Sequence, residues 1–402
     1  MKKYLGLILP ALLLFAAPLF AQRTALFPRF ASGTDGSGGK WKSEFFFTNQ
    51  GISEVQNIEV SFFDQTGAAA PVVTNLGSNS SFTFDLAAGA SQNIQITPSG
   101  STLVEGHVEI DYPDFDSPVR ASEVFRYELN GTVLVEVGMP QQEWGDHFSF
   151  PVTMNQTDRV FTAIALTNPT TAAQTFVVNL INTNGTLSST ATVPLAPGEH
   201  KAGYIDQAWL FPQLNNSNFS GSISVSSQKG AGVLTLRQDK DAFGAVSTDG
   251  GPVLLSSFLE TGSTASDADS TTGFANDFFE DAQALSIPVR VSGSIGYFDP
   301  GPDWDFYAFN GQAGKILTVI CDTTQVSGGS YADPIVGVYD SNYNEIALND
   351  QNGLAPGLYP SNDSFVQVVL PYTGTYYITV NDFWEDVGNT ADYKYYLHIK
   401  TR

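Results

Sequence analysis

Short runs rich in β-branched and aromatic residues recur along the chain, separated by clusters of Gly, Pro, Asn and Asp. They lie at 43–48, 57–63, 81–86, 106–112, 161–166, 175–181 and 221–226. Runs with this spacing are typical of antiparallel β-sandwiches. Helical periodicity is almost absent, and the best helical candidate, Tyr204–Leu210, is too short to define a fold. The sequence therefore predicts an all-β protein.

The amino-terminal 21 residues have the pattern of a secretory signal peptide. Lys2 and Lys3 precede an apolar run, and a small residue, Ala21, stands at the expected cleavage point. The alternative is a transmembrane anchor, but the apolar run is short for a bilayer core and contains Pro10 and Pro18. We therefore expect a secreted or extracellular protein that does not span a membrane. The alternative to free release is retention at the cell surface or by a partner.

The charge balance excludes one large class of partner. The chain has 41 Asp and Glu residues against 18 Lys and Arg residues, which gives a formal net charge of −23. No cluster of basic residues offsets this charge, so nucleic-acid binding is not expected, whereas calcium and cationic surfaces are favoured. Cys321 is the only cysteine, so no intramolecular disulfide can form. Its apolar surroundings in the sequence favour a buried, inert residue over a catalytic thiol.

The region 24–258 contains the same pattern twice, in the same order. Phe47–Gln50 is matched by Leu166–Pro169, and Leu86–Gly89 by Leu195–Gly198. A shared order of this kind indicates duplication of a unit of about 115 residues. The alternative is independent use of the same hairpin chemistry. We predict two related sandwiches, over 22–140 and 141–258.

A change of composition follows the second predicted sandwich. From Glu260 to Gly273 the chain holds no large apolar residue and is rich in Ser, Thr, Asp and Gly. This composition is typical of a flexible linker, predicted here over 259–273. The remaining residues, 274–402, form a third β-rich unit.

Several motifs in 274–402 occur in an order that resembles a known family. The resemblance is to the bacterial pre-peptidase C-terminal domain family, and it covers about a third of the chain. It implies a jelly-roll-like β-sandwich of the kind appended to many secreted proteases and other exported proteins. Residues 24–258 show no such resemblance. The motifs are Asn276-Asp277, Val291-Ser292-Gly293-Ser294-Ile295, Asp303-Trp304-Asp305-Phe306-Tyr307, Gly374-Thr375-Tyr376-Tyr377-Ile378 and Tyr393-Lys394-Tyr395-Tyr396-Leu397.

Calcium is the cofactor that this resemblance implies. Some collagenase-associated members hold calcium with an Asn-Asp pair and an Asp-x-Asp turn, and a hard cation prefers such oxygen ligands. Here Phe274 and Ala275 precede the pair, where those members have Glu residues, so an incomplete site or solvated turn carboxylates remain the alternative. The matching positions are Asn276, Asp277, Asp303 and Asp305.

Aromatic residues provide a second candidate site. Tyr393, Tyr395 and Tyr396 lie on the expected last strand, and exposed rings there would stack on a polysaccharide or pack against a fibrous protein. The alternative is core filling, because alternation puts Tyr393 and Tyr395 on one face of the strand.

No catalytic constellation is present in the sequence. The four His residues form no His-Glu-x-x-His pair, and no Gly-x-Ser-x-Gly elbow occurs. The segment Asp340–Glu345 begins like an EF-hand loop, but Glu345 occupies the position that requires Gly, so a hairpin turn is predicted. No protease domain is recognisable beside the unit that resembles a protease accessory domain.

The sequence thus predicts tandem antiparallel β-sandwiches followed by a C-terminal jelly-roll-like sandwich, and no enzyme. The expected function is that of a secreted binding module, stabilised by calcium, for an extracellular polysaccharide, a protein or the cell surface. One alternative is a structural or adhesive cell-envelope protein that acts by self-association. A hydrolase with an unrecognised site is the other.

Overall fold

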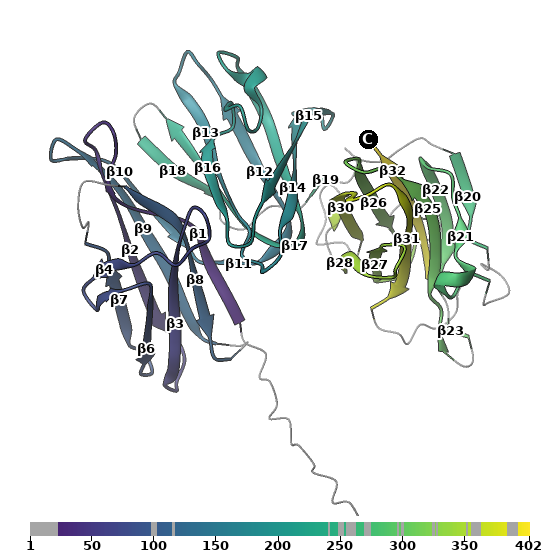
Figure 1. The fold of residues 1–402 in the computed structure, drawn as a ribbon, viewed down its shortest axis with the longest axis horizontal. Coiled ribbons are helices and arrows are strands. Elements are labelled where there is room, and N and C mark those ends of the chain that lie inside the picture. The colour runs from purple at the N-terminus through teal and green to yellow at the C-terminus, as the bar shows by residue number, and fades with distance from the viewer. Residues whose placement is uncertain are drawn as a thin grey trace, which may run out of the picture.

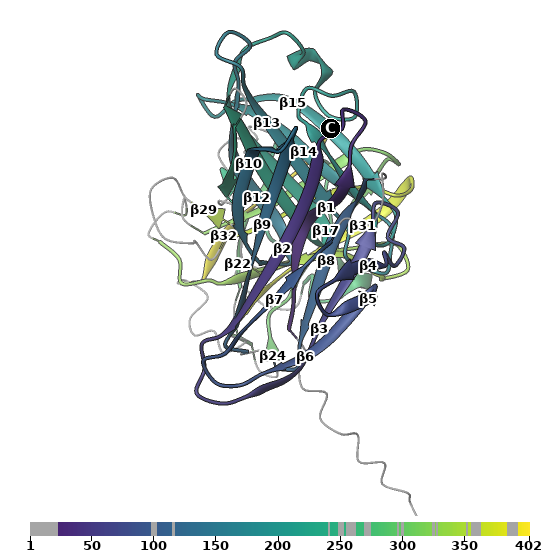
Figure 2. The ribbon, with the colours of Figure 1, turned by 90° about the vertical axis from the view of Figure 1, so that its left-hand side faces the viewer.

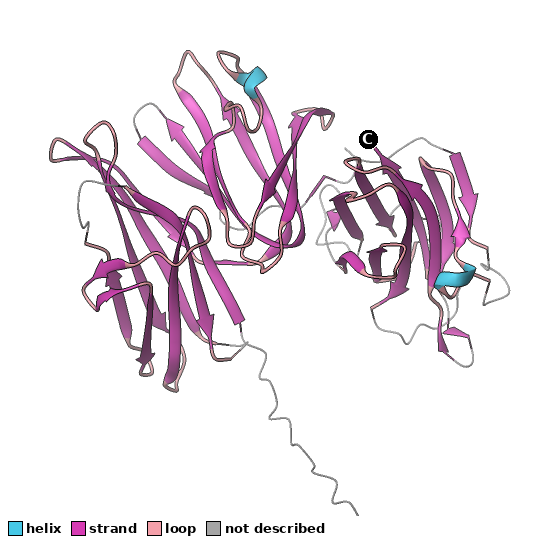
Figure 3. Ribbon diagram, viewed as in Figure 1, coloured by secondary structure: helices cyan, strands magenta, loops and turns pink. Residues whose placement is uncertain are grey.

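The computed structural model confirms the all-β prediction. Nearly every described element is a strand (Figure 3), apart from two short 3-10 turns, Pro212–Leu214 and Phe279–Asp281. The predicted signal peptide lies outside the described residues. In the described part of the chain, no helix has the length and apolar character needed to cross a bilayer. The structure describes residues 23–97, 103–114, 117–239, 242–247, 253–254, 263–268, 275–295, 297–298, 301–323, 326, 329–350, 353–354, 363–383 and 393–402.

The first sandwich packs the layer β11-β1-β8-β3-β6 against the layer β7-β2-β9-β10, and the end of β1 also pairs with β2. Figure 2 shows β9, β2, β1 and β8 next to one another, in the order of their pairing. Alternating residues such as Phe45, Phe47, Val60 and Phe62 fill the core between the layers. The strands are β1 (Arg23–Thr34), β2 (Lys40–Asn49), β3 (Val55–Asp64), β4 (Val72–Thr74), β5 (Gly77–Asn79), β6 (Ser81–Leu86), β7 (Ser91–Gln95), β8 (Val104–Tyr112), β9 (Val119–Leu129), β10 (Thr132–Pro140) and β11 (Gln142–Glu143).

The second sandwich has the same strand order. Its layers are β12-β17-β14-β15 and β16-β13-β17-β18, so the 21-residue strand β17 takes the places that β8 and β9 hold in the first sandwich. The strands are β12 (Gly145–Met154), β13 (Val160–Thr167), β14 (Gln174–Asn182), β15 (Leu187–Leu195), β16 (His200–Tyr204), β17 (Phe219–Asp239) and β18 (Ala242–Ser247). A short strand after it, β19 (Val253–Leu254), pairs in parallel with β29 (Gly353–Leu354).

The repeated sequence motif has one structural role in both sandwiches. Asn49 ends β2, and its Nδ2 donates to the carbonyl oxygens of Ser53 (2.8 Å) and Leu86 (2.9 Å). Asn168 directly follows the last residue of β13, and its Nδ2 donates to the carbonyl oxygens of Ala172 (2.9 Å) and Leu195 (3.2 Å). Each amide therefore ties the end of one strand to the loop after it and to the end of a strand in the facing layer. Duplication of one ancestral unit stays a prediction that this likeness supports.

The C-terminal sandwich packs two five-stranded sheets, β20-β22-β32-β26-β30 and β21-β25-β31-β27-β28. Cys321 is buried in the core between them. The strands are β20 (Ser263–Ser266), β21 (Gln283–Ala284), β22 (Val289–Ser294), β25 (Asp305–Gly311), β26 (Ile316–Asp322), β27 (Pro334–Tyr339), β28 (Glu345–Asn349), β30 (Ser364–Val369), β31 (Gly374–Asp382) and β32 (Lys394–Thr401), with a small hairpin of β23 (Tyr297–Phe298) and β24 (Gly301–Pro302).

The strand β20 corrects the linker prediction. It lies within 259–273, the stretch predicted to be flexible, and pairs in parallel with β22. β20 is an edge strand, and most of its residues are exposed, so it needs no large apolar side chains. Ser and Thr are sufficient to form it. Composition alone cannot separate such a strand from a linker.

The three sandwiches follow one another along the molecule, with the second between the other two (Figure 1). An apolar cluster that includes Phe125, Met139, Leu234 and Leu236 joins the first sandwich to the second. The backbones also meet at Gly67, where an added Cβ would lie 2.6 Å from the carbonyl oxygen of Pro197. Hydrogen bonds cross this interface from Thr167 Oγ1 to the Pro28 carbonyl oxygen (3.1 Å) and from Gln142 Nε2 to the Val233 carbonyl oxygen (2.7 Å).

A smaller interface joins the second sandwich to the third. Ile181 packs with Ile320 and Phe365, and Asn179 Nδ2 donates to Gln367 Oε1 at 2.8 Å. The ring of His147 meets the edge of Phe365, with 4.8 Å between ring centroids. Burial lowers the pKa of His147 to about 3, so this ring is neutral in the interface at physiological pH.

A buried acid lies near the larger interface. Glu123 on β9 is fully buried, and burial raises its pKa to about 8 against the weaker opposing effects of Ser43 and Arg29. The folded protein therefore keeps a proton on Glu123 that the unfolded chain releases above about pH 4.5.

We predict that Asn49→Ala and Asn168→Ala each lower the free energy of unfolding by about 2–4 kcal/mol, because each change leaves carbonyl oxygens at strand ends without their donor. Urea unfolding measures this loss. Asn184→Ala, at an exposed turn, is the control and should cost less than about 1 kcal/mol. A similarly small loss for Asn49→Ala or Asn168→Ala would contradict the shared role.

A second prediction concerns pH. Between about pH 5 and pH 8, Glu123 is ionised in the unfolded chain but protonated in the folded protein. This difference should lower the free energy of unfolding by up to about 1.4 kcal/mol for each pH unit. Glu123→Gln cannot ionise, so its stability relative to wild type should increase steadily as the pH rises across this range. Denaturant unfolding at a series of pH values tests this. The change with pH should be larger for Glu123→Gln than for the exposed control Glu54→Gln, and a constant difference for Glu123→Gln would refute the assignment.

Candidate binding surfaces of the C-terminal sandwich

A hydrogen-bonded network brings together two of the predicted calcium residues. Asn276 Nδ2 lies 3.1 Å from Asp267 Oδ1 and 3.4 Å from Asp305 Oδ1. The hydroxyl of Tyr395 donates to Asp305 Oδ2 at 2.5 Å, and that of Tyr307 to Asp267 Oδ1 at 3.0 Å. All five side chains are buried. Burial, followed by the charge of Asp305, raises the pKa of both tyrosines well above the usual value, so their hydroxyls remain donors.

The two other predicted calcium residues lie in the same segments. Asp303 is buried two residues before Asp305, and Asp277 is half-buried next to Asn276. Asp267 was missed by sequence reasoning because it falls in the stretch predicted to be a linker. The sequence signal that could have indicated it is an Asp directly after a short run rich in Ser and Thr, at 263–266.

Oxygen atoms dominate this network, as a hard cation requires. The carbonyl oxygen Oδ1 of Asn276 is buried and makes no hydrogen bond within the described structure. However, the described residues contain no group of three or more His, Cys, Asp or Glu side chains placed to hold a metal ion. Calcium binding at Asn276, Asp277, Asp303 and Asp305 therefore stays a prediction.

The structure corrects the prediction for Tyr395. Its ring is fully buried, because β32 turns Tyr395, Leu397 and Ile399 toward the core. Gly293 on the neighbouring strand leaves the space that the ring occupies, since a Cβ there would lie 2.4 Å from the Tyr395 hydroxyl oxygen. Tyr395 therefore supports the network beside Asp305 and cannot stack on a ligand.

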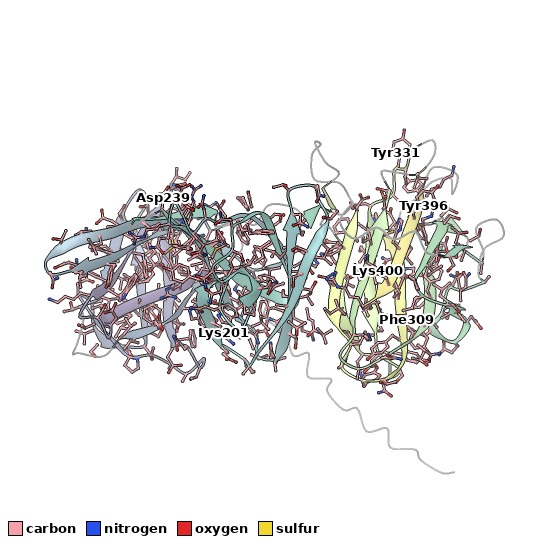
Figure 4. The ribbon with its side chains drawn as sticks, turned by 90° about the horizontal axis from the view of Figure 1, so that it is seen from above. Lys201, Asp239, Phe309, Tyr331, Tyr396 and Lys400 are labelled. Carbon is pink, nitrogen blue, oxygen red and sulfur yellow. The ribbon has the colours of Figure 1, made fainter. Side chains whose placement is uncertain are left out.

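Tyr393 and Tyr396 are partly exposed but do not form one platform. The ring of Tyr393 lies 6.4 Å from that of Tyr331, a residue that is 77% exposed and projects from the sandwich (Figure 4). Tyr396 lies on the other face of β32, where the guanidinium of Arg290 sits 4.8 Å from its ring centroid.

A larger group of aromatic rings covers the outer face of the sheet that contains β31. Tyr339 on β27 and Tyr377 on β31 are partners across the two strands, and they alternate with the core residues Val338 and Ile378. Phe279 packs against both tyrosines, with 5.3 Å between ring centroids in each pair. We call Phe279, Tyr339, Tyr343 and Tyr377 the aromatic surface. Tyr343 is 43% exposed, and Phe278, which precedes Phe279 in the chain, is 61% exposed.

The turn between β27 and β28 places Tyr343 over this surface. Asp340 Oδ1 accepts hydrogen bonds from the backbone N–H groups of Asn342 (2.7 Å) and Asn344 (2.9 Å). Tyr343 takes φ = +64°, a left-handed conformation that is uncommon for a bulky residue. Its ring stacks on Phe279 at 4.4 Å with an interplanar angle of 25°. This backbone conformation costs about 1–2 kcal/mol, and the ring that it positions stays accessible to solvent.

Sequence reasoning missed this surface for a physical reason. A sandwich core also requires many aromatic residues, and strand alternation does not apply to turns such as 340–345. The available signals were two adjacent Phe residues, Phe278 and Phe279, in a polar segment, and a Tyr within an Asp-Ser-Asn-Tyr-Asn turn.

Comparison with known proteins identifies no family. The sequence matches no family model and no curated protein. Among solved structures, the chain is similar to PliG, a periplasmic inhibitor of g-type lysozyme, from Salmonella Typhimurium. The identity is 19%, the match covers 30% of this chain and 98% of that one, and the TM-score is 0.19. A PliG mutant from Escherichia coli (18% identity, 35% and 100% coverage, TM-score 0.18) and PliG from Aeromonas hydrophila (18%, 35% and 96%, 0.17) give similar values. TM-scores this low carry no argument about function.

Proposed function

We propose that the protein is a secreted, non-catalytic binding protein whose C-terminal sandwich holds a neutral extracellular polysaccharide on the aromatic surface. The observation that carries this proposal is the solvent-accessible stack of Tyr343 on Phe279, held by a left-handed turn. Aromatic rings give a large apolar contact area, and the Tyr hydroxyls add hydrogen bonds at the rim. Such rings dominate the binding energy of many interfaces.

The charges around the aromatic surface favour a neutral polymer. Glu280 directly follows Phe279, and Glu345 lies on β28 beside the Tyr343 turn. Glu345 is the partner of Tyr339 across β27 and β28, and burial, followed by the charge of Glu345, raises the pKa of Tyr339. A polymer of acidic sugars would meet these two carboxylates and a chain of formal net charge −23.

We expect Tyr343→Ala and Tyr377→Ala each to weaken polysaccharide binding at least tenfold, as the loss of a central aromatic residue does at other interfaces. Binding is measured by co-sedimentation with insoluble cellulose and chitin and by gel retardation in soluble β-glucan and xylan. Tyr331→Ala removes an exposed ring elsewhere on the same sandwich and should leave binding unchanged. Failure of the wild-type protein to bind any of the four polymers, or an equal loss in Tyr331→Ala, would reject the proposal.

Calcium at the Asn276–Asp305 network is a separate part of the proposal. It is supported by the buried amide oxygen of Asn276 and by the two carboxylates, Asp267 and Asp305, that the same amide contacts. The four predicted residues are of the type that calcium prefers. Bound there, the ion would join the segment before β21 to the start of β25.

After treatment with EDTA, added calcium should raise the melting temperature of the C-terminal transition in the full-length protein by about 3 °C or more, since it binds only the folded state. This rise should be absent in Asp303→Asn and Asp305→Asn, and present in Asp281→Asn, an exposed carboxylate of the same segment. Differential scanning calorimetry measures each increment. An unchanged wild-type melting temperature, or an equal rise in Asp305→Asn, would contradict the site.

A further inference from the structure

A cavity of about 230 Å³ lies between the first and second sandwiches, far in sequence from the C-terminal surfaces. The first sandwich contributes two aromatic rings and an ion pair to its wall, and the second contributes small and aliphatic side chains together with Tyr204 and Gln207. The lining includes Arg29, Trp41, Glu105, Phe125, Ala202 and Leu234. We propose that this cavity binds one small neutral molecule with a flat apolar ring and a single hydrogen-bonding oxygen, a phenol or a close analogue.

The volume sets the size of the ligand. A cavity of about 150 Å³ lined by Leu, Ile and Phe is large enough to bind benzene. The present cavity exceeds that volume and falls short of the usual range for drug-sized ligands, about 300–1,000 Å³. One ring with a short substituent therefore matches it.

The walls set the shape of the ligand. The indole of Trp41 lies 4.9 Å from the ring of Phe125 and 4.4 Å from that of Tyr127, and its Nε1 donates to Asp35 Oδ2 at 3.2 Å. Because these contacts hold the indole, it presents a fixed flat wall. Ala202 and Leu234 supply the apolar side contributed by the second sandwich. A planar ring fits between a fixed aromatic wall and small aliphatic groups.

The charged side chains that line the cavity are the ion pair of Arg29 and Glu105. Arg29 Nη2 lies 2.8 Å from Glu105 Oε2, and the Arg29 side chain keeps 19% of its surface accessible. A guanidinium has five N–H groups in a planar fork, so this one contact leaves donors for a ligand oxygen. The guanidinium also lies 5.8 Å from the centroid of the Phe125 ring, which places these donors beside the aromatic wall.

The surrounding charges favour a neutral ligand. Glu105 neutralises Arg29, and a ligand carboxylate would meet this second carboxylate at close range. An anion would therefore find no uncompensated positive charge. This inference is independent of the function proposed for the C-terminal sandwich.

Titration of the full-length protein with phenol tests the inference, with isothermal titration calorimetry and thermal unfolding as measurements. We expect saturable binding of one phenol per chain and a rise in melting temperature. Benzoate has the same ring with a negative charge, and cyclohexanol has the same oxygen on a ring that is not flat. Both should bind at least tenfold more weakly than phenol.

A cavity-filling variant locates the site. Ala202→Leu should weaken phenol binding at least tenfold, and Ala163→Leu, at a second lining position, provides the same test if the first variant folds poorly. Ala191→Leu, a half-buried alanine on β15 outside the cavity, is the matched control and should bind as wild type does. The inference is overturned if phenol does not saturate, if benzoate binds equally well, or if the filled variants bind phenol like the control.

Discussion

A β-sheet has two faces, and a two-layer sandwich buries only one face of each sheet in its core. The outer faces of the three sandwiches therefore decide how the molecule is assembled and what it can bind. Phe125 and Leu234 face outward from their own cores and join the first two sandwiches. Ile181 and Phe365 do the same between the second and third. On the outer face of the sheet that contains β31, Tyr339 and Tyr377 stay half-exposed to solvent.

This constraint also explains what the sequence could predict. Alternation and turn residues predict strands, and the Asn49 and Asn168 motifs predict a repeated strand end, because both signals are local. Alternation places side chains on a common face but does not identify the face that is buried, and Tyr395 was misplaced for that reason. The strand at Ser263–Ser266 was missed because its stability comes from pairing with β22, a contact that local composition does not encode.

In the C-terminal sandwich, the fold and the predicted cation site depend on the same side chains. Tyr307 and Tyr395 fill the core with their rings and hold Asp267 and Asp305 with their hydroxyls. A polar network of this kind is stable only if its members are well satisfied, so core packing restricts which carboxylates can be present there. The aromatic surface is less restricted by core packing, because Tyr343 lies in an exposed turn outside the core.

The continuous strand β17 has a mechanical consequence. Its first half, near Ser226, lies in the layer that meets the C-terminal sandwich, and its second half carries Leu234 and Leu236 into the contact with the first sandwich. One unbroken length of backbone thus connects the two interfaces. A pulling force applied between the outer sandwiches would be carried across the middle sandwich along the covalent backbone of β17, and at the two interfaces by side-chain contacts.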